Sequence, residues 1–317
     1  MLPLLLALLL GAPLGAPPSP AAPLRLTSEA FGKPVEIEVR DLPRETSREI
    51  IQKALTEIAE IERLTGAAGS GIAALNAAAG KGPQPVDPRL LAALTRALDF
   101  CVWSEGAHGP LGRDLYTLWT EPADSEPPSP EQVEKAVGLA ACDRLTLDPQ
   151  KGTAALAAGS GLDFRGFAEG HAVDRAVEIL KKEGAANAFV RIGAVQRAVG
   201  SGPGGRGWPA ELFRAPGQEE PPDRIYLRDR SLAIASQALH VNQRTGRPAQ
   251  SVLATATVTD LAVDAQGLAS ALFITGPREG QLRLGSLRPR PSVRWFLGNG
   301  EGTPLLVDYR WSEVARR

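Results

Sequence analysis

The segment TSREIIQKALTEIAEIERL, residues 46–64, places the strongest constraint on how this chain can fold. Its apolar residues recur at helical spacing and share one face: Ile50, Ala54, Ile58 and Ile61. This period predicts an amphipathic helix, and the pair of Thr46 and Glu49 predicts a capping box at its start. Because such a helix must bury its apolar face, other elements have to pack against it.

Strand patterns lie on both sides of this helix. Val35, Ile37 and Val39 alternate with polar residues and predict a strand after a turn at Gly32. Residues 144–157 predict a hairpin that turns at DPQKG. Four further segments extend the strand prediction: a pair of strands in 188–213, another pair in 223–236, and tail strands in 292–299 and 302–310.

Helix starts and stops appear at several points between the strands. Asp87 before Pro88, and Ser129 before Pro130, are each typical of a helix N-terminus. A helix is also predicted over GHAVDRAVEILKKEGA, ending at Gly184, and residues 251–276 read as a strand followed by a helix of small residues. The mixture predicts a single α+β domain, with antiparallel or mixed sheets and flanking helices.

The first 23 residues, MLPLLLALLLGAPLGAPPSPAAP, differ from the rest of the chain. Their apolar run from Leu2 to Leu10 is too short to span a bilayer and is typical of a secretory signal. We therefore expect residues 1–23 to be a signal peptide and tether, and residues 24–317 to be the domain. This expectation places the protein outside the cytoplasm, in the periplasm, with at most a transient membrane association.

Charge and composition exclude one class of partner and leave open whether the two cysteines pair. Lys and Arg together number 35 and Asp and Glu 36, so we expect no binding to nucleic acid, which usually needs a basic excess. Cys101 and Cys142 would be able to pair in an exported protein, but Cys101 is also consistent with a buried thiol. The three histidines lie far apart in the sequence and are interpreted as structural.

The stretch LDFRGFAEGHAVDR, residues 162–175, places charged residues around the start of a helix, where free backbone N–H groups favour phosphate. It is one of an ordered series of motifs that includes FGK, SGIAALN, GAHGPL, VRIGAVQRAVG, NQRTGRP and VDAQGLASALFITG. In this order, from about Leu26 to Val307, the chain resembles the ApbE-type flavin transferases, the FAD:protein FMN transferases. The resemblance implies the ApbE-like, T-fold-related architecture.

The resemblance also implies a chemistry. Such enzymes cleave FAD, attach its FMN half to a Thr hydroxyl of a target flavoprotein and release AMP, with Mg²⁺ bridging the phosphates. The residues implied for flavin binding are Asp163, Glu169, Asp174, Gly193, Ser236, Arg244 and Thr245. The residues implied for the metal are Gly166, through its carbonyl, Gln266 and Ser270. Asp174 is equally consistent with an exposed helical acid paired with a nearby base.

Several residues depart from the family pattern. Gln266 stands where the family has Asp. Ser270 keeps the hydroxyl of the family pattern, and a carboxylate is present at Asp264, two residues before Gln266. Gly109 stands where the family has an acid, and Arg165 occupies a position that is usually small or uncharged. An amide is a poor substitute for a carboxylate on Mg²⁺. Two hypotheses follow: an FMN transferase of weak activity, or a non-catalytic relative that binds flavin or a partner protein.

Overall fold

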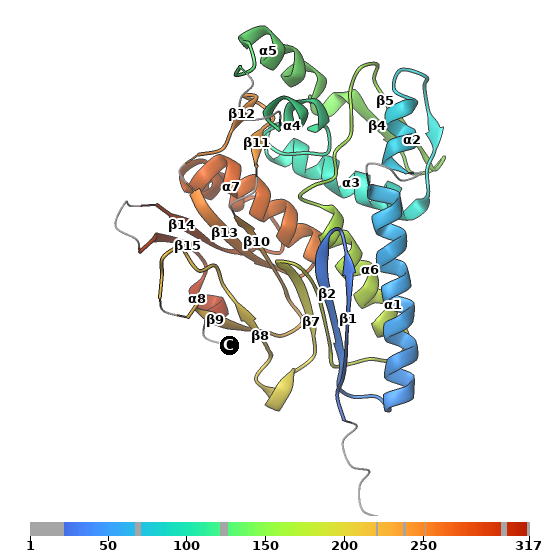
Figure 1. Ribbon diagram of the computed structural model, residues 1–317, viewed down its shortest axis with the longest axis vertical. Coiled ribbons are helices and arrows are strands. Elements are labelled where there is room, and N and C mark those ends of the chain that lie inside the picture. Colours follow the sequence, from blue (N-terminus) through green and yellow to red (C-terminus); the bar gives the residue numbers. More distant parts are fainter. Residues whose placement is uncertain are drawn as a thin grey trace, which may run out of the picture.

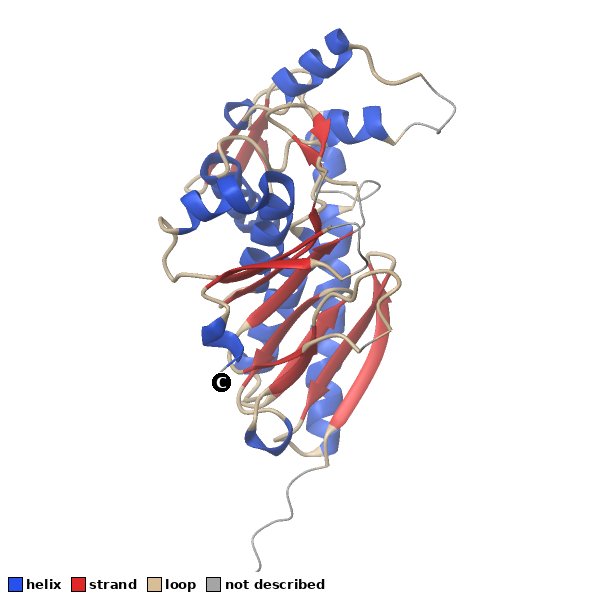
Figure 2. Cartoon of the chain, turned by 90° about the vertical axis from the view of Figure 1, so that its left-hand side faces the viewer, coloured by secondary structure: helices blue, strands red, loops and turns tan. Residues whose placement is uncertain are grey.

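A sheet of eight strands runs through the molecule, and each strand is antiparallel to its neighbours (Figures 1 and 2). The computed structural model describes residues 22–66, 71–120, 126–219, 221–236, 239–250, 252–298 and 303–315, so most of the expected signal peptide and tether lies outside it. In spatial order the strands are β1 (Leu24–Ala30), β2 (Lys33–Val39), β6 (Ala188–Ile192), β7 (Val195–Val199), β10 (Ser231–Ser236), β13 (Val252–Thr259), β14 (Ser292–Leu297) and β15 (Leu305–Tyr309). The α+β class is confirmed.

Three long helices cover one face of this sheet: α1 (Arg44–Thr65), α6 (Ala168–Lys182) and α7 (Ala262–Leu284) (Figure 1). All four apolar residues of the predicted α1 face are buried in the main core. The predicted capping box at Thr46 is wrong, because α1 begins two residues earlier. Its N-cap is Pro43, whose carbonyl accepts a hydrogen bond from the Ser47 N–H, and the cap has no side-chain hydrogen bond.

The opposite face of the sheet is covered by a hairpin of β8 (Trp208–Glu211) and β9 (Arg224–Leu227). Phe189 of the large sheet stacks on Trp208 at a ring distance of 5.4 Å and joins the two sheets in a second apolar cluster. The predicted pairing within 223–236 is wrong: β9 pairs with β8, whereas β10 pairs with β7 and β13. The chain turns from one sheet to the other at Asp229, whose φ is +52°.

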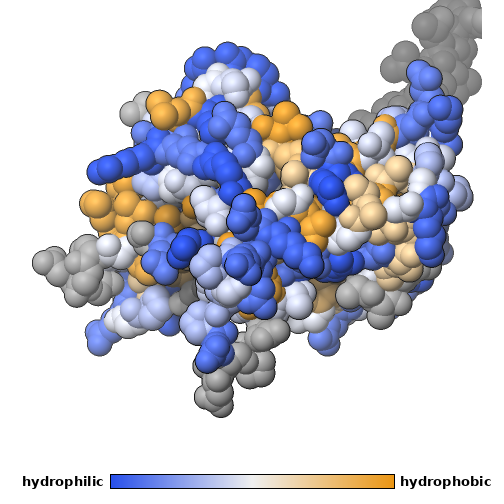
Figure 3. Space-filling view, turned by 90° about the horizontal axis from the view of Figure 1, so that it is seen from above, coloured by the Kyte–Doolittle hydropathy of each residue, from blue (hydrophilic) through white to orange (hydrophobic). Residues whose placement is uncertain are grey.

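A smaller helical part lies at one end of the sheet (Figure 1). Its elements are α2 (Ile72–Ala77), α3 (Pro88–Trp103), α4 (Arg113–Trp119), α5 (Pro130–Leu139), the 3₁₀ helix η1 (Cys142–Arg144), and a sheet of β3 (Gln84–Pro85), β5 (Thr153–Leu156) and β4 (Leu145–Asp148). The Asp87 and Ser129 caps and the DPQKG hairpin are confirmed. Seen from above, this end is mostly hydrophilic, with scattered apolar patches (Figure 3).

Short elements complete the described chain: η2 (Pro203–Gly205), β11 (Val241–Asn242), β12 (Arg247–Pro248) and α8 (Ser312–Ala315). A disulfide joins Cys101 of α3 to Cys142 of η1, with Cα atoms 5.9 Å apart, which resolves the question of their pairing. Among the described helices, none combines the length and the apolar character needed to cross a membrane.

Candidate functional site

A cavity of about 410 Å³ opens where α6 and α7 begin. Its walls also include the turn between β6 and β7, the strand β10, the loop before α4 and the loop before β11. Small residues on the sheet side keep the space open: Gly193, Ala194, Ala233 and Ala235. A cavity of this size, with a few polar groups among apolar ones, is typical of small-molecule sites.

A chain of polar contacts forms one wall of the cavity. The Lys33 ammonium donates to one carboxylate oxygen of Glu169, and the Gln266 side-chain amide donates to the other. The Gln266 carbonyl oxygen in turn accepts the backbone N–H of Gly170 at 2.7 Å. Burial by itself opposes ionisation of Glu169, but Lys33 and the Gln266 amide outweigh it, so the pKa of Glu169 is lowered. Glu169 and Gln266 are therefore fully engaged with each other and with their neighbours.

Helix α7 brings Gln266 and Ser270 to the same cavity because they are one helical turn apart. The start of α7 is held from α6. Asp174 accepts the backbone N–H groups of Ala262 at 2.8 Å and Val263 at 2.9 Å. The first turn of α7 has no side-chain cap of its own, so Asp174 supplies the acceptors that these N–H groups need.

Two histidines lie in this cavity, although the sequence suggested only structural roles for them. His108 stacks on Phe167 at 4.8 Å, and His240 packs on Phe273 at 4.4 Å. Burial lowers the pKa of His108 to about 3 and that of His240 to about 4, so both rings are neutral near pH 7. The one local signal was position: each histidine lies in or beside a motif that had been singled out, GAHGPL and NQRTGRP.

Six of the ten residues predicted for the site line the cavity: Gly166, Glu169, Gly193, Ser236, Gln266 and Ser270. Four do not. Asp163 binds the backbone and guanidinium of Arg165, and Asp174 is buried beside Arg197, with 2.6 Å between Oδ1 and Nη1. Asp174 is thus neither an exposed helical acid nor a residue of the cavity wall. Thr245 is exposed in the turn between β11 and β12.

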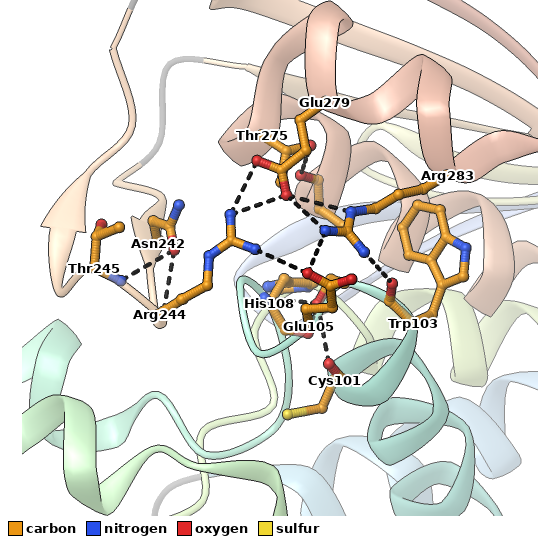
Figure 4. A network of polar contacts seen from close by, with 12 residues as sticks. Cys101, Trp103, Glu105, His108, Asn242, Arg244, Thr245, Thr275, Glu279 and Arg283 are labelled. Atoms are coloured by element: carbon orange, nitrogen blue, oxygen red, sulfur yellow. Dashed lines mark hydrogen bonds and ion pairs between the residues drawn. The ribbon is translucent and has the colours of Figure 1, made fainter.

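Arg244 is not among the residues that line the cavity, and its guanidinium belongs to an ion-pair network (Figure 4). Its Nη2 lies 2.9 Å from each carboxylate oxygen of Glu279, and Arg283 also binds Glu279. Glu105, in the turn that follows α3, accepts from Arg283 at 2.6 Å and lies 3.8 Å from Arg244. This network joins the β11–β12 turn to α7 and α3, so Arg244 has a structural role in the described protein.

Gly109, at the expected position of an acid, lies directly against the disulfide. A Cβ atom placed on Gly109 would lie 2.6 Å from Cys101 Cβ and 2.8 Å from its Sγ. The Gln243 side-chain amide donates to the Gly109 carbonyl at 2.8 Å and holds this loop in place. The disulfide thus occupies the space that a side chain at position 109 would need.

Arg165, at a position that is usually small or uncharged in the family, lines the cavity. Its guanidinium lies 4.0 Å from the centre of the Tyr116 ring and pairs with Asp163 at 2.7 Å. The side chain is therefore part of the cavity wall, held by an aromatic ring and a carboxylate.

The donors in the cavity do not fit Mg²⁺. Glu169 is the one carboxylate among the described lining residues, and it already binds Lys33 and Gln266. Asp264 does not substitute for it, because its Oδ1 accepts from Arg96 Nε at 2.6 Å. The described residues contain no group of three or more His, Cys, Asp or Glu side chains arranged for a metal. Mg²⁺ prefers charged, hard oxygen ligands, and beside the engaged Glu169 carboxylate this site offers it the Gln266 amide and the Ser270 hydroxyl.

Comparison with known proteins identifies relatives of the chain. The ApbE family model matches residues 31–290. A stretch of 194 residues is 27% identical to FAD:protein FMN transferase of Haemophilus influenzae and covers 55% of this chain and 56% of that one. Another of 140 residues is 35% identical to FAD:protein FMN transferase of Treponema pallidum and covers 41% and 38%. The chain thus matches about half or less of the length of these curated relatives.

Solved structures share the fold over a larger part of the chain. The apo crystal structure of Pseudomonas stutzeri flavinyl transferase ApbE is similar with a TM-score of 0.82 and 17% identity, over 95% of this chain and 99% of that one. The ApbE protein of Thermotoga maritima is similar with a TM-score of 0.80 and 21% identity, over 93% and 100%.

Proposed function

The chain belongs to the ApbE family, and from this we propose that it binds a flavin nucleotide in the central cavity but transfers FMN from FAD only weakly or not at all. The reaction concerned is the Mg²⁺-dependent transfer of FMN to a Thr hydroxyl of a target flavoprotein, with release of AMP. Flavin binding is supported by the open cavity at the start of α6 and α7, where six of the implied residues meet.

The observation that carries the proposal is the contact between Gln266 and Glu169. An Asp at position 266 would give a metal a full negative charge, whereas the Gln amide gives only a dipole. That amide is also occupied at both ends, by Glu169 and by the Gly170 N–H. Loss of a charged metal ligand in phosphoryl transfer costs about 4 kcal/mol of transition-state stabilisation, which is roughly a thousandfold in rate.

A working transferase remains the second candidate, and two retained features favour it. Ser270 keeps a hydroxyl on the cavity wall, and Gly166 keeps its place beside it. Glu169 would then have to leave Lys33 and Gln266 to serve a metal. The two candidates differ in the rate at which FAD is cleaved, which can be measured directly.

The test compares FAD binding with FAD cleavage in the purified chain without its first 23 residues. We expect FAD to quench or shift its fluorescence on binding, with an affinity that Mg²⁺ changes little. AMP release is followed by chromatography, with an acceptor flavoprotein from the same organism present. We expect the rate of AMP release to stay near that of FAD without the protein. Fast, Mg²⁺-dependent flavinylation would overturn the proposal of weak activity, and absence of flavin binding would overturn the proposal as a whole.

A charge-neutral exchange tests the role of the Gln266–Glu169 pair. The double variant Glu169→Gln/Gln266→Asp keeps one amide and one carboxylate but moves the carboxylate onto α7. We expect it to raise Mg²⁺-dependent AMP release by about tenfold or more, because the metal regains a charged ligand. The single variant Glu169→Gln is the control, since it removes the carboxylate without supplying another. Equal rates of Mg²⁺-dependent AMP release in the double and single variants would show that the residue at position 266 does not limit activity.

We also propose that the protein acts outside the cytoplasm. The Leu-rich start of the sequence supports this, and so does the Cys101–Cys142 disulfide, because disulfides persist in oxidising compartments. N-terminal sequencing of the protein from its native host should find a start near Ala16 or beyond. Recovery of intact Met1 in the cytosolic fraction would contradict the proposal.

A further inference from the structure

Two side chains give the central cavity its positive charge. Lys33 and Arg165 are the cations among the described residues that line it. Lys33 pairs with Glu169, and its side chain is 48% exposed against 10% for the carboxylate. Arg165 pairs with Asp163, and its side chain is 47% exposed against 17%. In both pairs the carboxylate is the more buried member, so the charge that a ligand meets first is positive.

The stem of Lys33 crosses the turn between β6 and β7. A Cβ atom placed on Gly193 would lie 2.9 Å from Lys33 Cδ, so the lysine stem uses the space that a glycine leaves free there. The Gly193 N–H donates to the Pro34 carbonyl at 3.0 Å and fixes this turn against β2. The ammonium has three N–H groups and donates to Glu169. Its other N–H groups have no partner among the described residues and are available to a ligand.

Arg165 is held from two sides. Its guanidinium lies 4.0 Å from the centre of the Tyr116 ring, and its Nε donates to the Asp163 carboxylate at 2.9 and 3.0 Å. Its Nη2 lies 2.7 Å from Asp163 Oδ2, whereas Nη1 makes no hydrogen bond with the described residues. The planar fork of a guanidinium matches the oxygens of a phosphate group. Arg165 therefore presents a fixed donor group at the cavity wall.

The other titratable groups of the cavity add no positive charge near pH 7. Burial lowers the pKa of His108 to about 3 and that of His240 to about 4, so both rings are neutral. Glu169 is the one carboxylate among the described lining residues. Two cations and one carboxylate leave this lining with one net positive charge, which favours an anionic ligand.

We propose that the cavity binds the phosphate groups of its flavin nucleotide through the side chains of Lys33 and Arg165, without a divalent metal ion. The inference rests on the proposed function and adds to it the part of the ligand that is recognised and the two residues that recognise it. The ammonium supplies a point charge, and the guanidinium supplies directed N–H donors. Affinity then depends on the phosphates, so riboflavin, which has none, binds more weakly than FAD.

Calorimetry on the purified chain without its first 23 residues, in excess EDTA, tests the proposal. The probes are inorganic pyrophosphate, FAD and riboflavin. We expect pyrophosphate to bind saturably and to compete with FAD. We expect FAD to bind at least about tenfold more tightly than riboflavin, because hydrogen bonds to a charged group are among the strongest in proteins. Pyrophosphate contains no flavin, so its binding is measured independently of the proposed function.

Matched variants test the two cations. Lys33→Met keeps an unbranched stem over Gly193 and removes the ammonium, and Arg165→Gln removes the guanidinium. We expect each to weaken pyrophosphate binding by about tenfold or more. Lys53→Met is the control: Lys53 also pairs with a glutamate and is 55% exposed, but it lies on α1 and outside the cavity. We expect it to bind pyrophosphate as the wild type does.

Glu169→Gln separates phosphate binding from a purely structural role of the ion pair. Removal of the carboxylate leaves the charge of Lys33 unopposed, so we expect pyrophosphate affinity to rise by about threefold or more. If Lys33 only held the wall through Glu169, breaking the pair would leave the affinity unchanged or lower it. Circular dichroism reports whether each variant is folded, and the folded variants decide.

The outcomes separate this proposal from the proposed function. Absence of saturable pyrophosphate binding, or equal pyrophosphate affinity in Lys33→Met and the wild type, would overturn the phosphate site. Equal affinities for FAD and riboflavin, or FAD binding that requires Mg²⁺, would overturn it as well while leaving flavin binding intact. Pyrophosphate binding without binding of either flavin would overturn the proposed function and leave a phosphate site at Lys33 and Arg165.

Discussion

At the scale of single residues, all three histidines are held in the neutral form by burial. The pKa is lowered to about 3 for His108 and to about 4 for His171 and His240, with desolvation as the largest cause in each case. In the unfolded chain these groups return to a pKa near the ordinary value of about 6.5. Between these values the unfolded chain binds more protons at the histidines than the folded one, so the contribution of the histidines to stability falls as the pH falls.

We therefore predict that the free energy of unfolding decreases between pH 7 and pH 5, by about 2 kcal/mol for each buried histidine. The contribution is complete above pH 6.5 and is lost progressively toward pH 4. Urea unfolding at both pH values, in the presence of a chelator, measures the change. His171→Phe should show a drop that is smaller than that of the wild type by about 2 kcal/mol. An equal drop in the two proteins would show that His171 does not titrate on unfolding.

At the scale of elements, α7 depends on α6 for its position. Asp174 of α6 accepts the first backbone N–H groups of α7 and also binds Arg197 of β7. One buried carboxylate thus joins two helices and the sheet. Because Gln266 and Ser270 follow within the first turns of α7, Asp174 acts on the cavity as a positioning residue.

We predict that Asp174→Asn destabilises the protein by about 3 kcal/mol, because it removes the charge beside Arg197 and weakens the cap of α7. Glu178→Gln is the control: Glu178 is also on α6 and binds Arg175, but its side chain is 57% exposed. That exposed pair should contribute less than about 1 kcal/mol. Chemical unfolding of the two variants checks the contrast. Similar small losses in both would mean that Asp174 does not hold α7.

At the scale of the whole molecule, the disulfide ties the smaller helical part together. Cys101 and Cys142 are 41 residues apart, and the segment between them contains α4 and α5. Cys101 also contacts Gly109, next to His108 on the cavity wall. The cross-link therefore connects the stability of this end of the molecule to the geometry of the site.

We predict that the double variant Cys101→Ala/Cys142→Ala is less stable than the oxidised wild type by about 4 kcal/mol, from the loop entropy that the cross-link removes from the unfolded chain. Urea unfolding under oxidising conditions measures the difference. Addition of a thiol reductant to the wild type should lower its midpoint to that of the variant. Equal midpoints for oxidised wild type and variant would contradict this prediction.

Much of the local structure could be predicted from the sequence because it depends on neighbouring residues. The caps at Asp87 and Ser129, the DPQKG hairpin and the apolar face of α1 are set by interactions within a few positions. The order of the motifs was also enough to identify the family and the α+β class. Six of the ten predicted site residues line one cavity, since they lie at the ends of elements that the family fold brings together.

Only the tertiary structure decided which segments pair and which polar groups meet. β9 and β10 are adjacent in the sequence but belong to different sheets, because pairing depends on distant strands and on burial of the faces. The resemblance implies Asp174 and Arg244 for flavin binding, and only the structure shows that their side chains also hold α7 and the β11–β12 turn. His108 and His240, 132 positions apart by their numbers, share one cavity wall. Local sequence patterns carry no record of such contacts, since these form only when the chain has folded.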